Sequence, residues 1–202
     1  MKLFWSSRSP FARMVVAAAH ELGIAERISL ERVVVSGSAP NGDVLARNPL
    51  GQIPTLLLPD GSALFDSAVI LEYLDLHHGP HRLLPASAEE RLAVLRLQAL
   101  GDGLMENSVR RLGERTRGPL GSERHAEGHR VKIGRTLDWL EAGVGQLASV
   151  NAGTLAIACG LGHLDFRFAE DGWREGRPRL DAWFATFSAR PSMRATAHSD
   201  ER

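Results

Sequence analysis

The chain contains 202 residues, of which 44% are hydrophobic and 24% are charged, the balance of an ordinary globular protein that can bury a core. The 24 basic and 24 acidic side chains cancel, which argues against nucleic acid or an anionic membrane surface as a partner. No apolar run approaches the length of a membrane span, and the first residues lack the apolar core of a signal peptide. We therefore expect a cytoplasmic protein with no membrane partner. The single cysteine, Cys159, excludes an intramolecular disulfide, and its apolar surroundings predict a buried, unreactive thiol.

The N-terminal part of the chain has the pattern of a strand, a helix and a second strand. The residues Lys2–Trp5 have the pattern of a short strand. A helix is predicted to start at Pro10, to continue over 11–22 and to end before Gly23. The apolar residues within 28–35 predict a second strand in a buried, central position. A unit of this length indicates that the two strands are parallel.

The most informative stretch is 48–67, which reads NPLGQIPTLLLPDGSALFDS. It contains a strand that follows Pro54, a turn, a second short strand, and then a helix that begins at Asp66-Ser67. A proline at the mouth of a strand leaves nearby backbone groups free for an extended ligand, and the Ile53–Pro54 bond is one where a cis peptide is tolerated. The unpaired N–H groups at the start of a helix suit a carboxylate. The stretch therefore predicts two points that could hold a small peptide.

A polar connection containing Pro80 and Pro85 marks a domain boundary, after which no strand pattern survives. Helices are predicted over 87–115, 123–147, 154–168 and 178–189. We expect the polar tail after Pro191 to fray. The sequence thus predicts an α/β domain over 1–78 with a four-stranded mixed sheet and helices on both faces, a linker over 79–86, and an all-α domain over 87–202.

The stretch 48–67 resembles the glutathione-binding half of the glutathione S-transferase family, in which a cis-proline follows Val or Ile and an acidic-Ser pair begins the third helix. Ser9-Pro10-Phe11-Ala12-Arg13 also resembles the Cys-Pro-Phe-x-Arg motif of omega-like and thiol-transferase relatives, with serine in place of cysteine. The resemblance extends over essentially the entire chain. It implies a thioredoxin-like N-terminal domain, an all-helical C-terminal domain, glutathione as co-substrate, no metal, and a homodimer.

The resemblance also implies a set of site residues. Ser9 is expected to donate a hydrogen bond to the glutathione thiolate and, with the start of its helix, to lower the thiol pKa. Ser6 and Ser7 are rivals for this role. The expected substrate-binding residues are Phe11, Asn48, Gln52, Ile53, Pro54, Asp66, Ser67, Met105 and Ser108. Of these, Met105 and Ser108 are proposed from helical facing alone, beside a hydrophobic electrophile to which the enzyme would conjugate glutathione.

Several alternatives stay open at this point. Ser9 could be only the N-cap before Pro10, because serine is common at helix starts. The protein could be a non-catalytic interaction module of transferase-like fold, or a glutathione-dependent disulfide reductase, although a serine cannot form the mixed disulfide that a cysteine would. His125 and His129 have the i, i+4 spacing that zinc can use, but no third ligand is evident, so no metal site is predicted.

Overall fold

The structure is a computed structural model that describes residues 1–36 and 38–200. It divides into two compact units. The first comprises Met1–Ala88 together with the C-terminal segment from Pro191, and the second comprises Glu89–Arg190. The chain therefore leaves the first unit near the predicted linker and returns to it at the end.

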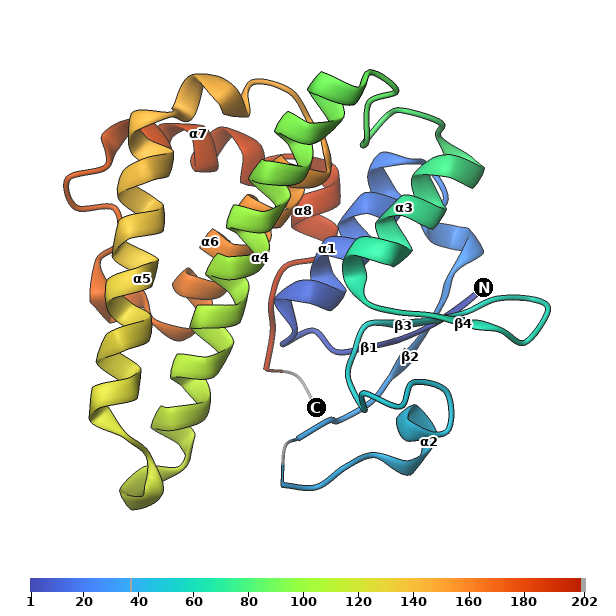
Figure 1. Cartoon of the computed structure of the whole chain (residues 1–202), viewed down its shortest axis with the longest axis horizontal. Coiled ribbons are helices and arrows are strands. Elements are labelled where there is room, and N and C mark those ends of the chain that lie inside the picture. Colours follow the sequence, from blue (N-terminus) through green and yellow to red (C-terminus); the bar gives the residue numbers. More distant parts are fainter. Residues whose placement is uncertain (37, 201–202) are drawn as a thin grey trace. The chain divides into compact units, whose positions relative to one another are not determined.

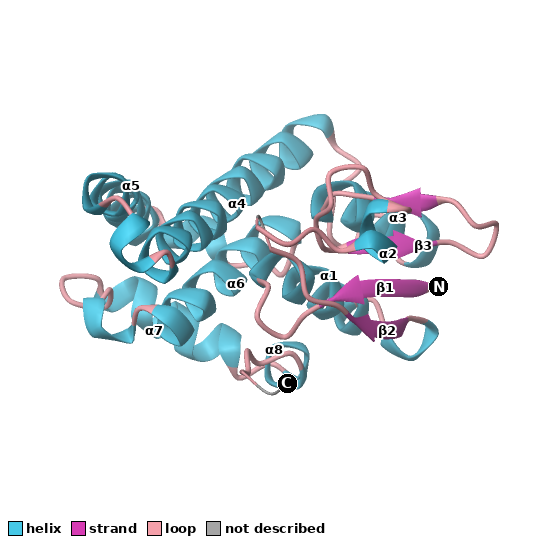
Figure 2. Cartoon of the chain, turned by 90° about the horizontal axis from the view of Figure 1, so that it is seen from below, coloured by secondary structure: helices cyan, strands magenta, loops and turns pink. Residues whose placement is uncertain are grey.

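The first unit is built on a four-stranded sheet of order β2-β1-β3-β4 (Figure 2). Its strands are β1 (Lys2–Trp5), β2 (Ser29–Arg32), β3 (Thr55–Leu57) and β4 (Ala63–Leu64). β1 is parallel to β2 and antiparallel to β3, and β3 is antiparallel to β4. The predicted mixed sheet is confirmed. The predicted central position of the second strand is wrong, because β2 is an edge strand and Val34, beyond its end, is 74% exposed.

Alternate side chains of β1 face the two layers that cover the sheet. Leu3 is fully buried and shares a hollow with Val16 and Ala19 of α1 (Pro10–Glu21). α1 packs against α3 (Ser67–His78) on this side (Figure 1). On the opposite side, Phe4 forms a cluster with Val44 of the short helix α2 (Gly42–Leu45), which the sequence analysis did not predict. The period of two in a strand produces this division.

The end of the chain differs from its prediction. α8 (Pro191–Ala195) packs against α1, so the last residues belong to the first unit and not to the helical domain over 87–202. Arg13 explains this: it is only 7% exposed on α1, and its guanidinium donates to the carbonyl oxygen of Met193 at 3.1 Å. A buried cation requires such partners, and the C-terminal segment supplies them. Residues 191–200 are therefore held in place, whereas the sequence predicted a frayed tail.

The second unit is all-helical. Its helices are α4 (Ala88–Thr116), α5 (Glu123–Ala142), α6 (Ala152–Arg167) and α7 (Pro178–Ser188). Short 3₁₀ turns occur at Gly118–Leu120, Val144–Leu147 and Ala169–Asp171. α6 is buried over most of its length, including the thiol of Cys159, and α7 contacts both α5 and α6 (Figure 2). This is the arrangement expected of an apolar central helix covered by amphipathic ones.

Small residues allow α4 and α6 to approach closely. A Cβ atom at Gly101 would lie 2.5 Å from the backbone carbon of Ala156, and one at Gly153 would lie 2.5 Å from the Cβ of Leu97. Among the helices that the structure describes, none is long and apolar enough to cross a membrane.

Candidate glutathione site

The sheet topology brings the predicted site residues to one end of the sheet. β1 ends at Trp5, just before the turn that carries Ser9, and Phe4 of this strand pairs with Thr55 of β3. Because β1 and β3 are antiparallel, the end of β1 lies beside the start of β3, where Pro54 stands. Leu64 of β4 pairs with Leu56, so the segment that follows β4 also emerges at this end. Three adjacent strands thus present the start of α1, the Ile53–Pro54 peptide and the start of α3 side by side.

Ser9 is the N-cap of α1. Its backbone is extended, with φ −84° and ψ 119°, and its Oγ accepts a hydrogen bond from the N–H of Ala12 at 3.2 Å. A hydroxyl has one donor hydrogen in addition to its lone pairs, so capping leaves the Ser9 O–H able to donate. Ser9 is half-buried, and its backbone N–H bonds the carbonyl of Ser6. The capping role and the predicted donor role are therefore compatible.

The other two serines of this turn are engaged differently. Ser6 Oγ accepts from the backbone N–H of Arg8 at 3.3 Å. Ser7 donates its hydroxyl hydrogen to the carbonyl oxygen of Ser199 at 3.0 Å. Ser9 combines a donor hydrogen with a place at the helix start, which favours it over Ser6.

The Ile53–Pro54 bond is cis, as the sequence predicted. Ile53 precedes β3 and is half-buried. Within the part of the chain that the structure describes, its backbone N–H and C=O make no hydrogen bond to the protein. An extended peptide could therefore pair with this residue as an added strand would. The Phe65–Asp66 bond is also cis, which the sequence analysis did not predict.

Asp66 is the N-cap of α3, and its Oδ1 accepts from the N–H of Ala68 at 3.0 Å. Its carboxylate is exposed and keeps Oδ2 for another partner. Ser67 is the first helical residue and is 3% exposed. Among the described residues, neither its N–H nor its hydroxyl has a protein partner, so both can serve an anion at the positive end of the helix.

Asn48 lies behind this surface and not on it. It is 1% exposed, and its Nδ2 donates to the carbonyl of Gln52 and to Thr55 Oγ1, each at 3.0 Å. Its Oδ1 accepts from the N–H of Leu50 at 3.0 Å. The side chain of Asn48 is thus occupied in holding the loop before Pro54, and its role in ligand binding stays a prediction. The side chain of Gln52 is exposed.

Three further predicted residues lie outside this set of contacts. Phe11 is half-buried in the first turn of α1, on the same helix start as Ser9. Met105 and Ser108 belong to α4 in the helical unit and are fully buried, and Ser108 Oγ lies 2.8 Å from Nδ1 of His163 on α6. Their contact with an electrophile remains a prediction.

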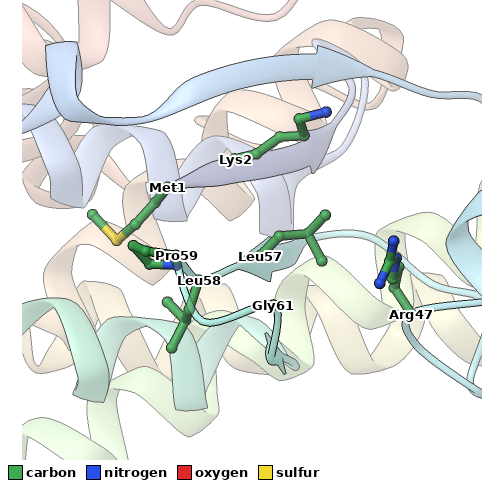
Figure 3. Close-up of a pocket in the computed structure, with 7 residues that line it drawn as sticks. All are labelled: Met1, Lys2, Arg47, Leu57, Leu58, Pro59 and Gly61. Carbon is green, nitrogen blue, oxygen red and sulfur yellow. The ribbon is translucent and has the colours of Figure 1, made fainter.

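A separate hollow of about 350 Å³ lies at the opposite end of the same strands. Figure 3 shows the apolar residues Met1, Leu57, Leu58 and Pro59 with Lys2 and Arg47 around it. It contains none of the predicted site residues, and Lys2 is paired with Glu31 at 2.7 Å. No cluster of three potential metal-ligating side chains occurs within residues 1–36 and 38–200.

The four-stranded sheet with its cis-proline, followed by a helical unit, defines a thioredoxin-like domain joined to an all-α domain. Residues 8–77 match the family described as "Glutathione S-transferase, N-terminal domain". The uncharacterized GST-like protein YibF of Escherichia coli (strain K12) is 36% identical over 202 residues, which span 97% of this chain and 98% of YibF. The chain therefore belongs to the glutathione S-transferase family.

Solved structures agree with this assignment. The crystal structure of a glutathione transferase family member from Pseudomonas fluorescens Pf-5 with bound glutathione is 40% identical, covers 98% of both chains and has a TM-score of 0.95. A crystal structure of a family member from the same organism, with bound S-(propanoic acid)-glutathione, is 39% identical, with a TM-score of 0.90 over 98% of this chain and 100% of that one.

Sequence reasoning did not find the role of Arg13. Arg13 is buried, and it donates to the carbonyl of Met193 and to Thr196 Oγ1. One signal was available: Arg13 stands among the apolar residues of α1, where an exposed cation would not be expected.

Proposed function

We propose that this protein is a glutathione transferase that binds glutathione, activates its thiol and conjugates it to a hydrophobic electrophile. The observation that carries the proposal is the meeting, at one end of the sheet, of three groups with complementary chemistry. These are the hydroxyl of Ser9 at the start of α1, the unpaired backbone of Ile53 before the cis-proline, and the Asp66-Ser67 pair at the start of α3. An acidic tripeptide with one thiol matches this set.

Glutathione would be held along its length by these groups. The backbone of Ile53 pairs with the cysteinyl residue, as in strand addition. The N–H and hydroxyl of Ser67 receive the γ-glutamyl carboxylate, and the free oxygen of Asp66 accepts from the γ-glutamyl ammonium, which is a charge-assisted hydrogen bond. The thiol then lies toward the start of α1. Each contact uses a group that has no other partner in the described protein.

Activation of the thiol follows from the start of α1. The Ser9 O–H donates to the thiolate, and the positive end of the helix dipole favours the same charge, so both lower the thiol pKa. The thiol proton passes to solvent. The thiolate sulfur then bonds to an electrophilic carbon while the bond to the leaving group breaks, or it adds to an activated double bond and the carbon takes a proton from water. Met105 and Ser108 are the proposed contacts of the electrophile.

Conjugation is favoured over disulfide reduction because position 9 holds a serine. A cysteine there could attack a glutathione disulfide and carry the mixed disulfide, whereas a serine hydroxyl cannot. The bound S-(propanoic acid)-glutathione of the Pseudomonas fluorescens relative is a thioether, the kind of compound that conjugation produces, and it supports this choice. We place the reaction in the cytoplasm, where glutathione thiols stay reduced.

The proposal is tested by two measurements on the same preparation. Titration calorimetry should detect glutathione binding, and absorbance should follow conjugation of 1-chloro-2,4-dinitrobenzene. Binding together with conjugation supports the transferase. Binding with no conjugation of any electrophile tried would favour a non-catalytic module, and reduction of a mixed disulfide without conjugation would favour the reductase. Absence of glutathione binding would contradict the proposal as a whole.

We further propose that the protein is a homodimer, as the family resemblance implies. Each unit exposes apolar side chains on a helix: Val69 and Leu76 of α3 are 48% and 49% exposed, and Leu92 and Leu95 of α4 are 69% and 40% exposed. Exposed apolar faces of this kind mark interfaces. Sedimentation equilibrium at micromolar concentration should give twice the 22.0 kDa mass of the chain, and a monomer would contradict the proposal.

A further inference from the structure

The C-terminal segment, here residues 191–200, runs beside the turn that carries Ser9. In Figure 1 this segment, coloured red, leaves α8 and passes the start of α1, and both belong to the first unit. The two parts are almost the whole chain apart in sequence. The contacts between these two parts must therefore order the segment, because a polar tail with no partners would be disordered.

The near end of the segment is fixed by the buried Arg13. Its Nη2 donates to the carbonyl of Met193 at 3.1 Å, and its Nε lies 3.5 Å from Thr196 Oγ1. Thr196 is 9% exposed and also donates to the carbonyl of Ser192 at 2.8 Å. Ser192 in turn donates to the carboxylate of Glu21 at the other end of α1. The root of the segment is thus attached along α1.

The far end of the segment exchanges hydrogen bonds with the turn. The Ser7 hydroxyl donates to the carbonyl of Ser199 at 3.0 Å, and His198 Nδ1 lies 2.9 Å from the carbonyl of Ser7. A carbonyl can only accept, so Nδ1 of His198 carries a proton. Arg8 forms an ion pair with Asp200 at 3.2 Å and also donates to its carbonyl. We call these contacts of Ser7 and Arg8 with His198, Ser199 and Asp200 the clasp.

The clasp contacts Ser7 and Arg8, the two residues immediately before Ser9, which is the proposed thiol-activating residue. The N–H of Ser9 bonds the carbonyl of Ser6, so residues 6–9 form one hydrogen-bonded turn. The clasp holds the two central residues of this turn, Ser7 and Arg8, from outside. It leaves Ser9 itself uncontacted, because Ser9 Oγ bonds only within α1 among the described residues. A turn fixed in this way holds the Ser9 hydroxyl in one direction.

We propose that the C-terminal segment is a positioning element for thiol activation, in which His198 and Ser7 hold the turn so that the Ser9 O–H is aimed at the glutathione sulfur. This inference rests on the proposed function. The inference concerns thiol activation alone. Loss of the clasp lets the turn move and weakens the hydrogen bond to the thiolate, while the contacts of Ile53 and Ser67 with glutathione remain. The effect should therefore appear in the thiol pKa and not in affinity.

The test compares Ser7→Ala, His198→Ala and a chain that ends at Ala197 with the unaltered protein. Each single substitution should raise the pKa of bound glutathione by about half a unit, and the shortened chain by about one unit. Conjugation below that pKa should slow by about threefold and about tenfold, because the thiolate fraction falls in proportion. The dissociation constant of glutathione should change by less than about twofold, since the binding contacts remain.

Two further variants separate positioning from general damage. His198→Asn places an amide N–H close to where Nδ1–H stands and should restore the thiol pKa that His198→Ala loses. Ser29→Ala is the matched control for Ser7→Ala, because Ser29 is exposed on β2 and its hydroxyl makes no hydrogen bond within the described residues. Hydrogen exchange gives a readout without glutathione: amides of residues 8–13 should exchange about tenfold faster in the shortened chain.

The outcomes distinguish this inference from the proposed function. If the unaltered protein conjugates but Ser7→Ala, His198→Ala and the shortened chain keep its thiol pKa and exchange rates, the clasp is overturned and the transferase stands. If the unaltered protein does not lower the thiol pKa at all, the proposed function fails, and the positioning role fails with it even where hydrogen exchange shows that the clasp orders the turn. Loss of affinity in step with activity would also overturn the inference.

Discussion

Replacement of Ser9 by alanine should raise the pKa of glutathione bound to the protein and slow conjugation, while binding is largely kept. In the proposed mechanism the Ser9 hydroxyl donates its hydrogen to the thiolate, and its oxygen caps the N–H of Ala12 at 3.2 Å. Affinity should change little because the contacts at Ile53 and Ser67 do not involve this residue.

The size of the effect follows from the two hydrogen bonds that the substitution removes. A hydrogen bond to a charged group contributes about 1.5–3 kcal/mol, which corresponds to about one to two pKa units for the bound thiol. Loss of the N-cap should separately lower the free energy of unfolding by about 0.5–2 kcal/mol. Ser9→Gly retains most of the capping preference but has no hydroxyl, so it isolates the first effect from the second.

The assay is an absorbance titration of the bound thiolate alongside conjugation rates. Ser9→Ala and Ser9→Gly should both raise the pKa of the bound thiol, and Ser9→Thr should retain much of the activation. Ser9→Cys should gain thiol–disulfide exchange activity that proceeds through a mixed disulfide. The reasoning would be refuted if Ser9→Ala changed neither the thiol pKa nor the rate. A simultaneous change in both for Ser6→Ala would assign the activating role to Ser6.

Three other predictions concern affinity, packing and pH. Ser67→Ala and Asp66→Ala should each weaken glutathione binding by about 1.5–3 kcal/mol in calorimetry, and unchanged affinity would remove them from the site. Gly101→Ala should lower the free energy of unfolding by about 1–3 kcal/mol, because the added Cβ would lie 2.5 Å from the backbone of α6. Gly103→Ala on the same helix has open space and should instead stabilise by about 1 kcal/mol; equal effects on urea unfolding would contradict the packing argument. Burial, followed by nearby cationic side chains, lowers the pKa of His129 below its ordinary 6.5. The unfolded chain therefore takes up this proton first as pH falls, so stability should decline from pH 6.5 downward through the lowered pKa, and His129→Asn should reduce that decline in urea titrations at pH 7.5 and 5.5. The same decline of stability with pH in His129→Asn and in the unaltered protein would contradict the role of His129.

Local chemistry explains which elements were predictable from the sequence. The cis bond before Pro54 and the start of a helix at Asp66-Ser67 are decided by residues within a few positions of each other, and both were predicted correctly. β1 was predicted with its observed bounds, because it is a short apolar run followed by a polar loop. In each case the determining interaction is contained in the segment itself.

Elements whose environment is set by distant segments were not predictable in this way. The valines near β2 suggested a central strand, but strand order depends on which neighbours pair, and within residues 1–36 and 38–200 no strand covers the outer edge of β2. The tail was expected to fray because its partner, Arg13, lies almost the whole chain away. Asn48 is a polar loop residue in the sequence, and nothing near it shows which groups its side chain bonds. Its hydrogen bonds to Gln52 and Thr55 become visible only in the folded loop.

The site also divides its tasks between elements, and this division explains how a serine can serve where relatives hold a cysteine. An N-cap hydroxyl uses a lone pair for the helix and keeps its hydrogen, so capping and donation to a thiolate do not compete. The proposed recognition of the γ-glutamyl end rests on a different helix, through Asp66 and Ser67, whose available groups do not depend on position 9. Because the two helices begin at the same end of one sheet, our proposal assigns the choice of reaction to position 9 and the choice of ligand to the start of α3. The arrangement therefore permits a change of chemistry without a change of co-substrate.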